Sequence, residues 1–150
     1  MNWEIVAGVF VAALAGGFFP AVCSEFLVVG AVVADPADTV AIVIAASSGQ
    51  MIAKTSYYAL ARWAPHYLPA RARSALGRAQ GAVASRGRAV GSLVLMSAGV
   101  GLPPFFLVSL ACGALGVGLV TFAVTGIAGR TARYVVLAGL ARAGSLAVGG

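Results

Sequence analysis

Three charged residues, Glu25, Arg130 and Arg133, lie inside long apolar stretches of the sequence. Arg130 and Arg133 are three positions apart, so in a helix they share a face with the adjacent Tyr134. A guanidinium group binds phosphate or carboxylate oxygens through paired hydrogen bonds. An acid at membrane depth is costly and usually faces a cavity or an opposite charge. We therefore predict that Glu25, Arg130, Arg133 and Tyr134 belong to a transport or ligand-binding site.

Two other interpretations of these charges stay open. Glu25 could form an ion pair that only holds the two halves of the chain together. Arg130 and Arg133 could instead lie at a membrane boundary and extend their charged ends to the lipid headgroups.

A second group of polar residues recurs every four positions: Lys54, Tyr58 and Arg62. This spacing predicts one polar stripe along a helix, which in a membrane faces protein or water. Lys54 is the deeper charge of the three and is a further candidate for the site, whereas Arg62 resembles an interfacial residue.

Catalytic and metal-binding constellations are absent from the sequence. The single histidine, His66, has no Cys, Asp or Glu near it, and the chain has no HExxH, GxSxG or CxxC motif and no phosphate-binding glycine loop. Cys23 and Cys112 each lie in an apolar stretch, where a small buried side chain is the expected role. We predict that the protein is not an enzyme and uses no metal or cofactor.

The composition predicts an integral membrane protein. Hydrophobic residues make up 61% of the chain and charged residues 9%, against about a quarter charged residues in soluble domains. Six of the ten basic residues lie between positions 62 and 88. Such a segment is typical of a cytoplasmic loop, so we predict a multi-pass protein of the inner or plasma membrane rather than a nucleic-acid binder.

The lengths of the apolar stretches predict two re-entrant hairpins. Between Arg88 and Arg130 lie 41 uncharged residues, which as one helix would run about 60 Å, twice the ~30 Å hydrocarbon core. The prolines Pro103 and Pro104 must break this stretch. The 13 residues of 89–101 would reach only about 20 Å, so they should enter the membrane and turn back.

The first apolar stretch, 3–34, is also too long for one membrane span and should break. Its break is expected near the glycines at 16–17 and at Pro20, which leaves 21–34 too short to cross the membrane. A full span over 3–21 followed by an interfacial helix is the alternative, and it leaves the side of the N-terminus open. Each hairpin should be followed by a longer helix, at 38–63 and 116–142.

The two halves of the chain resemble each other. The segments 20–30 (PAVCSEFLVVG) and 103–113 (PPFFLVSLACG) have equal length and each begins at a proline break. We predict an all-α membrane domain over 1–150, with half one at 3–64, a cytoplasmic Arg-rich amphipathic segment at 65–88 and half two at 89–142. An Arg-rich loop between the halves would orient them oppositely, as an inverted repeat of the kind found in transporters.

Several motifs resemble those of the DedA/VTT superfamily, also called the SNARE-associated Golgi protein-like membrane proteins. FPAVCSEFLVVGAV resembles its P-x-x-x-S-E hairpin, SSGQMIAKTSYYALARWAP its Gly-rich helix, and the stretch from GLPPFF to GRTARYVVLAGL its second hairpin and last helix. The ending GRTARYVVLA is similar to the short YqaA-type branch. The resemblance extends from about Phe18 to Leu140.

The resemblance implies two opposed re-entrant hairpins and a role in moving lipids across the bilayer. Larger DedA members couple transport to the proton gradient through an embedded acid and arginines, and Glu25 matches that acid. The arginine that usually precedes the second hairpin's proline is missing from SAGVGLPP, which puts proton coupling in doubt. Arg130 and Arg133 are candidates to supply the positive charge.

The resulting expectation is a translocase or scramblase for an anionic phospholipid or lipid phosphate. Membrane lipids are the expected partners, with protons and a homo-oligomer left open. A small-solute or ion exporter on the same repeat, and a membrane scaffold without transport, are the alternatives. The identity of the lipid cannot be read from the sequence.

Overall fold

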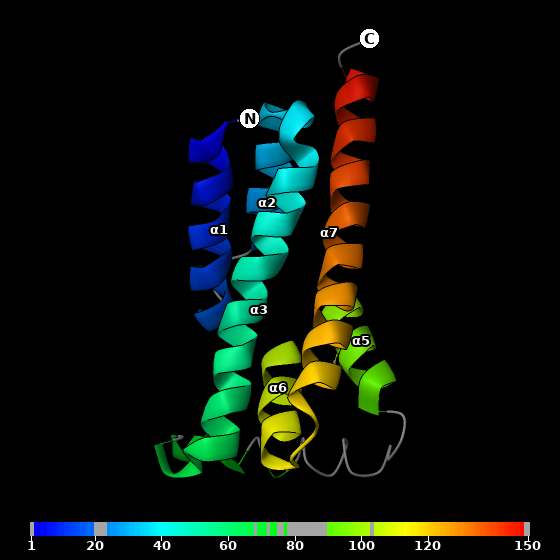
Figure 1. Ribbon diagram of the computed structural model, residues 1–150. Helices are drawn as coiled ribbons and strands as arrows, with labels where there is room; N and C mark the ends of the chain where they lie inside the picture. Colours follow the sequence, from blue (N-terminus) through cyan, green and yellow to red (C-terminus); the bar gives the residue numbers. More distant parts are fainter. Residues whose placement is uncertain are drawn as a thin grey trace. The chain divides into compact units, whose positions relative to one another are not determined.

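The computed structural model describes residues 2–19, 24–67, 69–71, 73–74, 77, 90–102 and 104–148. All regular structure in these ranges is helical, which confirms the all-α prediction. The principal helices are α1 (Trp3–Phe18), α2 (Ser24–Ala34), α3 (Thr39–Trp63), α5 (Val90–Val100), α6 (Phe105–Ala114) and α7 (Leu119–Val148) (Figure 1). Short 3-10 turns lie at Pro36–Asp38 and Pro65–Tyr67.

The predicted break of the long uncharged stretch is present. Helix α5 ends at Val100, Gly101 takes a positive φ of 90°, and Pro104 is the N-cap of α6. A glycine is suited to this left-handed backbone, and a proline suits the start of the next helix. The first stretch likewise divides into α1 and α2, although Pro20 and Pro103 lie outside the described residues, as does most of the predicted Arg-rich amphipathic segment.

The second long helix begins later than predicted. Gly116 was expected to open it, but it lies in the turn after α6 with a φ of 72°. The Gly116 amide donates to the Gly113 carbonyl and the Val117 amide to the Cys112 carbonyl. These two bonds form a Schellman motif, which needs a glycine-like residue after the helix end, so α7 starts only at Leu119 and continues past Arg142 to Val148.

By length and apolar composition, no single described helix qualifies on its own as a membrane span. Helix α2 and the segment Pro36–Trp63, bent by 119° between them, qualify as a pair, and α1, α5 and α6 are shorter apolar helices. Both long helices carry polar residues in their middle, which lowers their hydropathy. The membrane placement of α3 and α7 stays a prediction.

The chain packs as two compact units. The first unit comprises residues 1–53 and 130–150, and the second comprises residues 54–129. Each unit therefore contains one pair of short helices together with part of α3 and part of α7.

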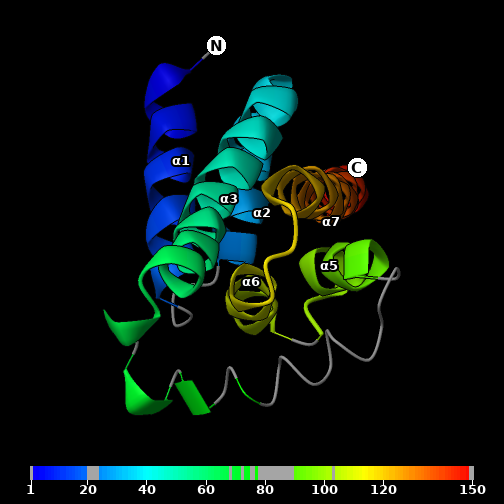
Figure 2. The same ribbon diagram turned by 60° about the horizontal axis from the view of Figure 1, so that its bottom comes forward.

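In the first unit, α1 lies directly beside the first half of α3 in both views (Figures 1 and 2). Gly49 of α3 faces the α1 backbone so closely that a Cβ there would lie 2.6 Å from the Phe10 carbonyl oxygen and 3.0 Å from the Leu14 nitrogen. Close helix contact at small residues is the packing mode of membrane helices. Val28, Val32, Ile42 and other buried apolar side chains of α1, α2, α3 and α7 form the core around this contact.

In the second unit, α6 packs against the last part of α3 in the same way. A Cβ on Gly113 would overlap the carbonyl of Tyr58. The Tyr58 hydroxyl donates to the Val117 carbonyl in the turn after α6, and its ring stacks on Phe122 with centroids 5.0 Å apart. The ring of Phe105 also stacks on the ring of Phe122, with centroids 5.9 Å apart. Tyr58 thereby connects α3 to α6, to the following turn and to α7.

We predict that Gly49→Ala destabilises the protein by about 1–3 kcal/mol or more, because the added methyl group meets main-chain atoms that cannot rotate away. Gly8→Ala is the matched control, since a Cβ at Gly8 meets no atom within 4 Å. It should be neutral or stabilise α1 by up to about 1 kcal/mol through helix propensity. Unfolding of both variants in detergent micelles measures the difference, and equal stabilities would contradict the close contact.

Candidate functional site

Glu25 lies in the first turn of α2, directly after Ser24, where the exposed amide groups of a helix favour a negative charge. Its Oε1 lies 3.0 Å from Nη2 of Arg133 on α7. The structure therefore brings together Glu25 and one of its two predicted partners. The side chains of Glu25 and Arg133 are 31% and 27% exposed, so a ligand can reach the pair from outside.

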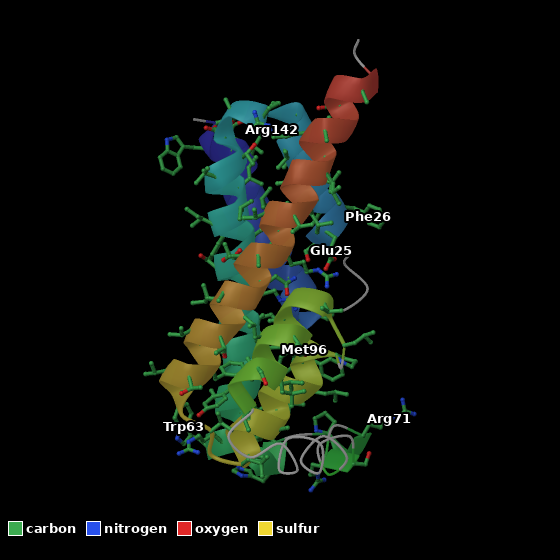
Figure 3. All side chains as sticks on the ribbon, turned by 90° about the vertical axis from the view of Figure 1, so that its right-hand side faces the viewer. Glu25, Phe26, Trp63, Arg71, Met96 and Arg142 are labelled. Atoms are coloured by element: carbon green, nitrogen blue, oxygen red, sulfur yellow. The ribbon has the colours of Figure 1, made fainter. Side chains whose placement is uncertain are left out.

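Next to Glu25, the side chain of Phe26 points away from the first unit (Figure 3) and is 79% exposed. Leu27 and Val33, also on α2, are 42% and 51% exposed. The Glu25–Arg133 ion pair therefore lies beside exposed apolar side chains of α2.

Behind the ion pair lies a layer of buried hydroxyl and amide groups. Oγ of Ser24 is 3.0 Å from the Tyr134 hydroxyl, and Nε2 of Gln50 on α3 donates to Ser24 Oγ at 2.9 Å. Ser24, Gln50 and Tyr134 are each at most 4% exposed. Because buried polar groups need partners, these contacts specify how α2, α3 and α7 meet.

Arg130 is the second cation of the site, and it is buried, with 7% of its surface exposed. Its guanidinium group hydrogen-bonds the Tyr134 hydroxyl and acts electrostatically on Arg133 and Glu25. The alternative in which Arg130 extends its charged end to lipid headgroups concerns its depth in a membrane and stays a prediction.

The chemistry of the groups gives the hydrogen-bond chain a direction. Arg130 can only donate, so the Tyr134 oxygen accepts from it and Tyr134 sends its own proton to Ser24. Ser24 then accepts from Tyr134 and Gln50, and its hydroxyl points to Oε2 of Glu25 over a long 3.5 Å. The buried arginine is thereby connected to the carboxylate through two hydroxyl groups.

The electrostatic balance of this cluster, which we define as Ser24, Glu25, Gln50, Arg130, Arg133 and Tyr134, is positive. It holds two guanidinium groups and one carboxylate. A charge in a low-dielectric environment is costly unless an opposite charge compensates it. The named side chains of the cluster therefore carry one net positive charge, and the accessible end of the cluster is the Glu25–Arg133 pair.

The predicted stripe on α3 belongs to the second unit. Lys54 is 7% exposed, with its Nζ 5.5 Å from the centre of the Tyr57 ring. Tyr58 is buried and holds the Val117 carbonyl, whereas Arg62 is exposed and its Nη1 lies against Gly116. Tyr58 therefore has a structural contact of its own, and the stripe comprises buried Lys54 and Tyr58 followed by exposed Arg62.

Two members of the cluster, Ser24 and Gln50, were not singled out by the sequence analysis. A signal for Gln50 was available, because Ser47, Gln50 and Lys54 are spaced to share one face of α3, and all three are buried. Ser47 lies 3.4 Å from Thr131 of α7, adjacent to Arg130. Buried polar residues at helical spacing in an apolar helix indicate a polar partner on a neighbouring helix.

No protein-family model, curated protein or solved structure matches this chain.

We predict that Tyr134→Phe destabilises the protein by about 1–3 kcal/mol, because buried Arg130 and Ser24 lose a hydroxyl partner while the ring volume is kept. Tyr67→Phe is the control, since the Tyr67 side chain is 74% exposed. Thermal unfolding in detergent compares the two variants. Equal stabilities would show that the Tyr134 hydroxyl does not hold the cluster together.

Proposed function

We propose that this protein is a membrane protein that moves an anionic lipid, a phospholipid or lipid phosphate, between the two leaflets of a bilayer. The observation that carries the proposal is the cluster at Glu25: two guanidinium groups share one carboxylate, and the accessible end of the cluster opens beside exposed Phe26. This arrangement suits a phosphate group that arrives from an apolar phase.

The membrane setting rests on composition and helix length. The chain is 61% hydrophobic. Helices α5 and α6 have 11 and 10 residues, which as helices extend about 15–17 Å, half of the ~30 Å hydrocarbon core. Paired helices of this length suit re-entrant hairpins. We include in the proposal the resemblance to the DedA/VTT superfamily and the inverted repeat. The repeat is supported by the helices of the two units, since each unit contains a pair of short helices with part of α3 and part of α7.

The mechanism that we propose is an exchange of anions. In the empty site Glu25 neutralises Arg133, and the Ser24–Tyr134 contact holds the layer behind them. A lipid phosphate, which has more acceptor oxygens than a carboxylate, competes with Glu25 for the planar guanidinium group. Arg130 supports the bound anion from its buried position. Release follows when Glu25 returns to Arg133, so no covalent step is needed.

A proton can take part in this exchange without being required for it. The resemblance to the DedA/VTT superfamily implies coupling to a proton gradient, although the arginine that usually precedes the second hairpin's proline is missing from this chain. Flip rates measured with and without a pH gradient separate this coupled exchange from simple scrambling.

The test is a flip assay on the full chain reconstituted in liposomes with fluorescent phosphatidylglycerol. We expect the protein to accelerate flip, and Arg133→Gln to reduce the acceleration at least about tenfold, equivalent to about 1.4 kcal/mol. Arg133→Lys keeps the charge but not the planar guanidinium group, so its flip rate should lie between those of the unmodified protein and Arg133→Gln. Arg71→Gln is the charge-matched control, because Arg71 is exposed and is not one of the cluster residues.

Glu25→Gln separates transport from a structural ion pair. We expect it to bind anionic lipid more tightly and to flip it more slowly, since the internal competitor is gone. A variant that only loses stability, with unchanged flip, would indicate a scaffold. If the folded protein accelerates the flip of no lipid class, polyprenyl phosphate included, the proposal is wrong, and flux of a solute in the same liposomes would point to an exporter.

A further inference from the structure

A second feature of the first unit is an apolar groove of about 340 Å³ between the first part of α3 and the last part of α7. Val40, Val43 and Ile44 line it from α3, and Val135 and Gly139 from α7. Val40, Ile44 and Val135 are 73%, 58% and 54% exposed. The groove is thus a hydrophobic surface that the described part of the first unit leaves uncovered.

The groove is separate from the charged cluster. On α7 it is lined by Thr131, Val135, Ala138, Gly139 and Arg142, which are spaced to follow one face of the helix. Arg130 and Arg133 lie on another face, because each residue turns the helix by about 100°, and Tyr134 lies between the two faces. Nothing in the proposed exchange at Glu25 uses the groove.

The α7 wall of the groove matches one leaflet of a bilayer in length, whereas the α3 wall, from Thr39 to Ile44, rises by about 8 Å. From Thr131 to Arg142 the helix rises by about 16 Å, half of the ~30 Å hydrocarbon core. Arg142 lines the groove together with Thr39, the first residue of α3, which directly follows the Pro36–Asp38 turn. The cation of Arg142 thus lies at one end of the groove, and the α7 wall of the groove is about as long as one leaflet is thick.

We propose that this groove holds one acyl chain of a resident anionic phospholipid, whose phosphate pairs with Arg142. The positive charge at one end of an otherwise apolar groove is complementary to such a lipid. A helix from a second copy is about 10–12 Å across and over this length would occupy more than roughly 1,000 Å³, whereas a single hydrocarbon chain is far narrower. The lipid is a bound component and is distinct from the transported lipid.

The inference shares only the membrane setting with the proposed function. It concerns binding at a different face of α7, and the experiment reads out binding rather than flip. A protein that moves no lipid could still hold this one, and loss of the groove lipid would leave the proposal for Glu25 standing.

The test uses the full chain in liposomes that contain phosphatidylglycerol with a photoreactive acyl chain, followed by mass spectrometry of the labelled peptides. We expect labels concentrated at Val40, Ile44 and Val135. Gly139→Phe should fill the groove and reduce this labelling at least about fivefold. A Cβ at Gly139 meets no atom within 4 Å, so the change is compatible with the fold.

Two controls define the result. Gly30→Phe adds the same ring at another open glycine, on α2, and should leave the labelling unchanged. Arg142→Gln should remove the preference for phosphatidylglycerol over phosphatidylcholine while labelling of the groove persists.

Three results would overturn the proposal. The first is equal labelling of the groove and of exposed Val120 and Val124 outside it, which would mean ordinary contact with bulk lipid. The second is labelling that Gly139→Phe leaves unchanged. The third is an efficient disulfide between copies carrying Val40→Cys, which would assign the groove to a second copy of the chain.

Discussion

The hydrogen bond between Ser24 and Tyr134 is the contact on which the first unit depends. It joins two residues 110 positions apart, both almost fully buried, and Gln50 of α3 completes it. In a low-dielectric interior a hydroxyl group without a partner is costly, so α2, α3 and α7 must meet in the one register that satisfies all three. The Glu25–Arg133 pair is then placed one residue farther out along each helix, where a ligand can reach it.

The glycines at helix contacts and the charged residues of the cluster have different roles. Gly49 and Gly113 let helix backbones approach closely, which stabilises each unit through van der Waals contact. The cluster contributes less to stability than an apolar core of equal volume would, because burying charged groups costs desolvation free energy. This free-energy cost is explained if the net positive charge binds an anionic ligand. In the proposed mechanism the accessible Arg133 binds the anion, and the buried Arg130 supports it from within the cluster.

The sequence predicted the helices better than the site. The breaks followed from length and proline, and the pairing of Glu25 followed from the cost of an isolated charge. Ser24 could not be chosen from the sequence with equal ease, because a serine hydroxyl can hydrogen-bond the backbone of its own helix and then needs no partner elsewhere. Gly116 was assigned to α7 because hydropathy does not distinguish a helix residue from a Schellman turn. The groove was beyond prediction, since it depends on the spacing between α3 and α7.

The central claim is that a positively charged cluster lies at membrane depth, and the depth of Phe26 tests it most directly. A nitroxide label at Phe26→Cys, with Cys23 and Cys112 replaced by serine, can be compared in liposomes with one at Arg71→Cys for collisions with oxygen and with a water-soluble nickel complex. The account predicts frequent oxygen collisions and few nickel collisions at position 26, and the reverse at position 71. Equal access of nickel to both positions would contradict it, because the Glu25 cluster would then face water.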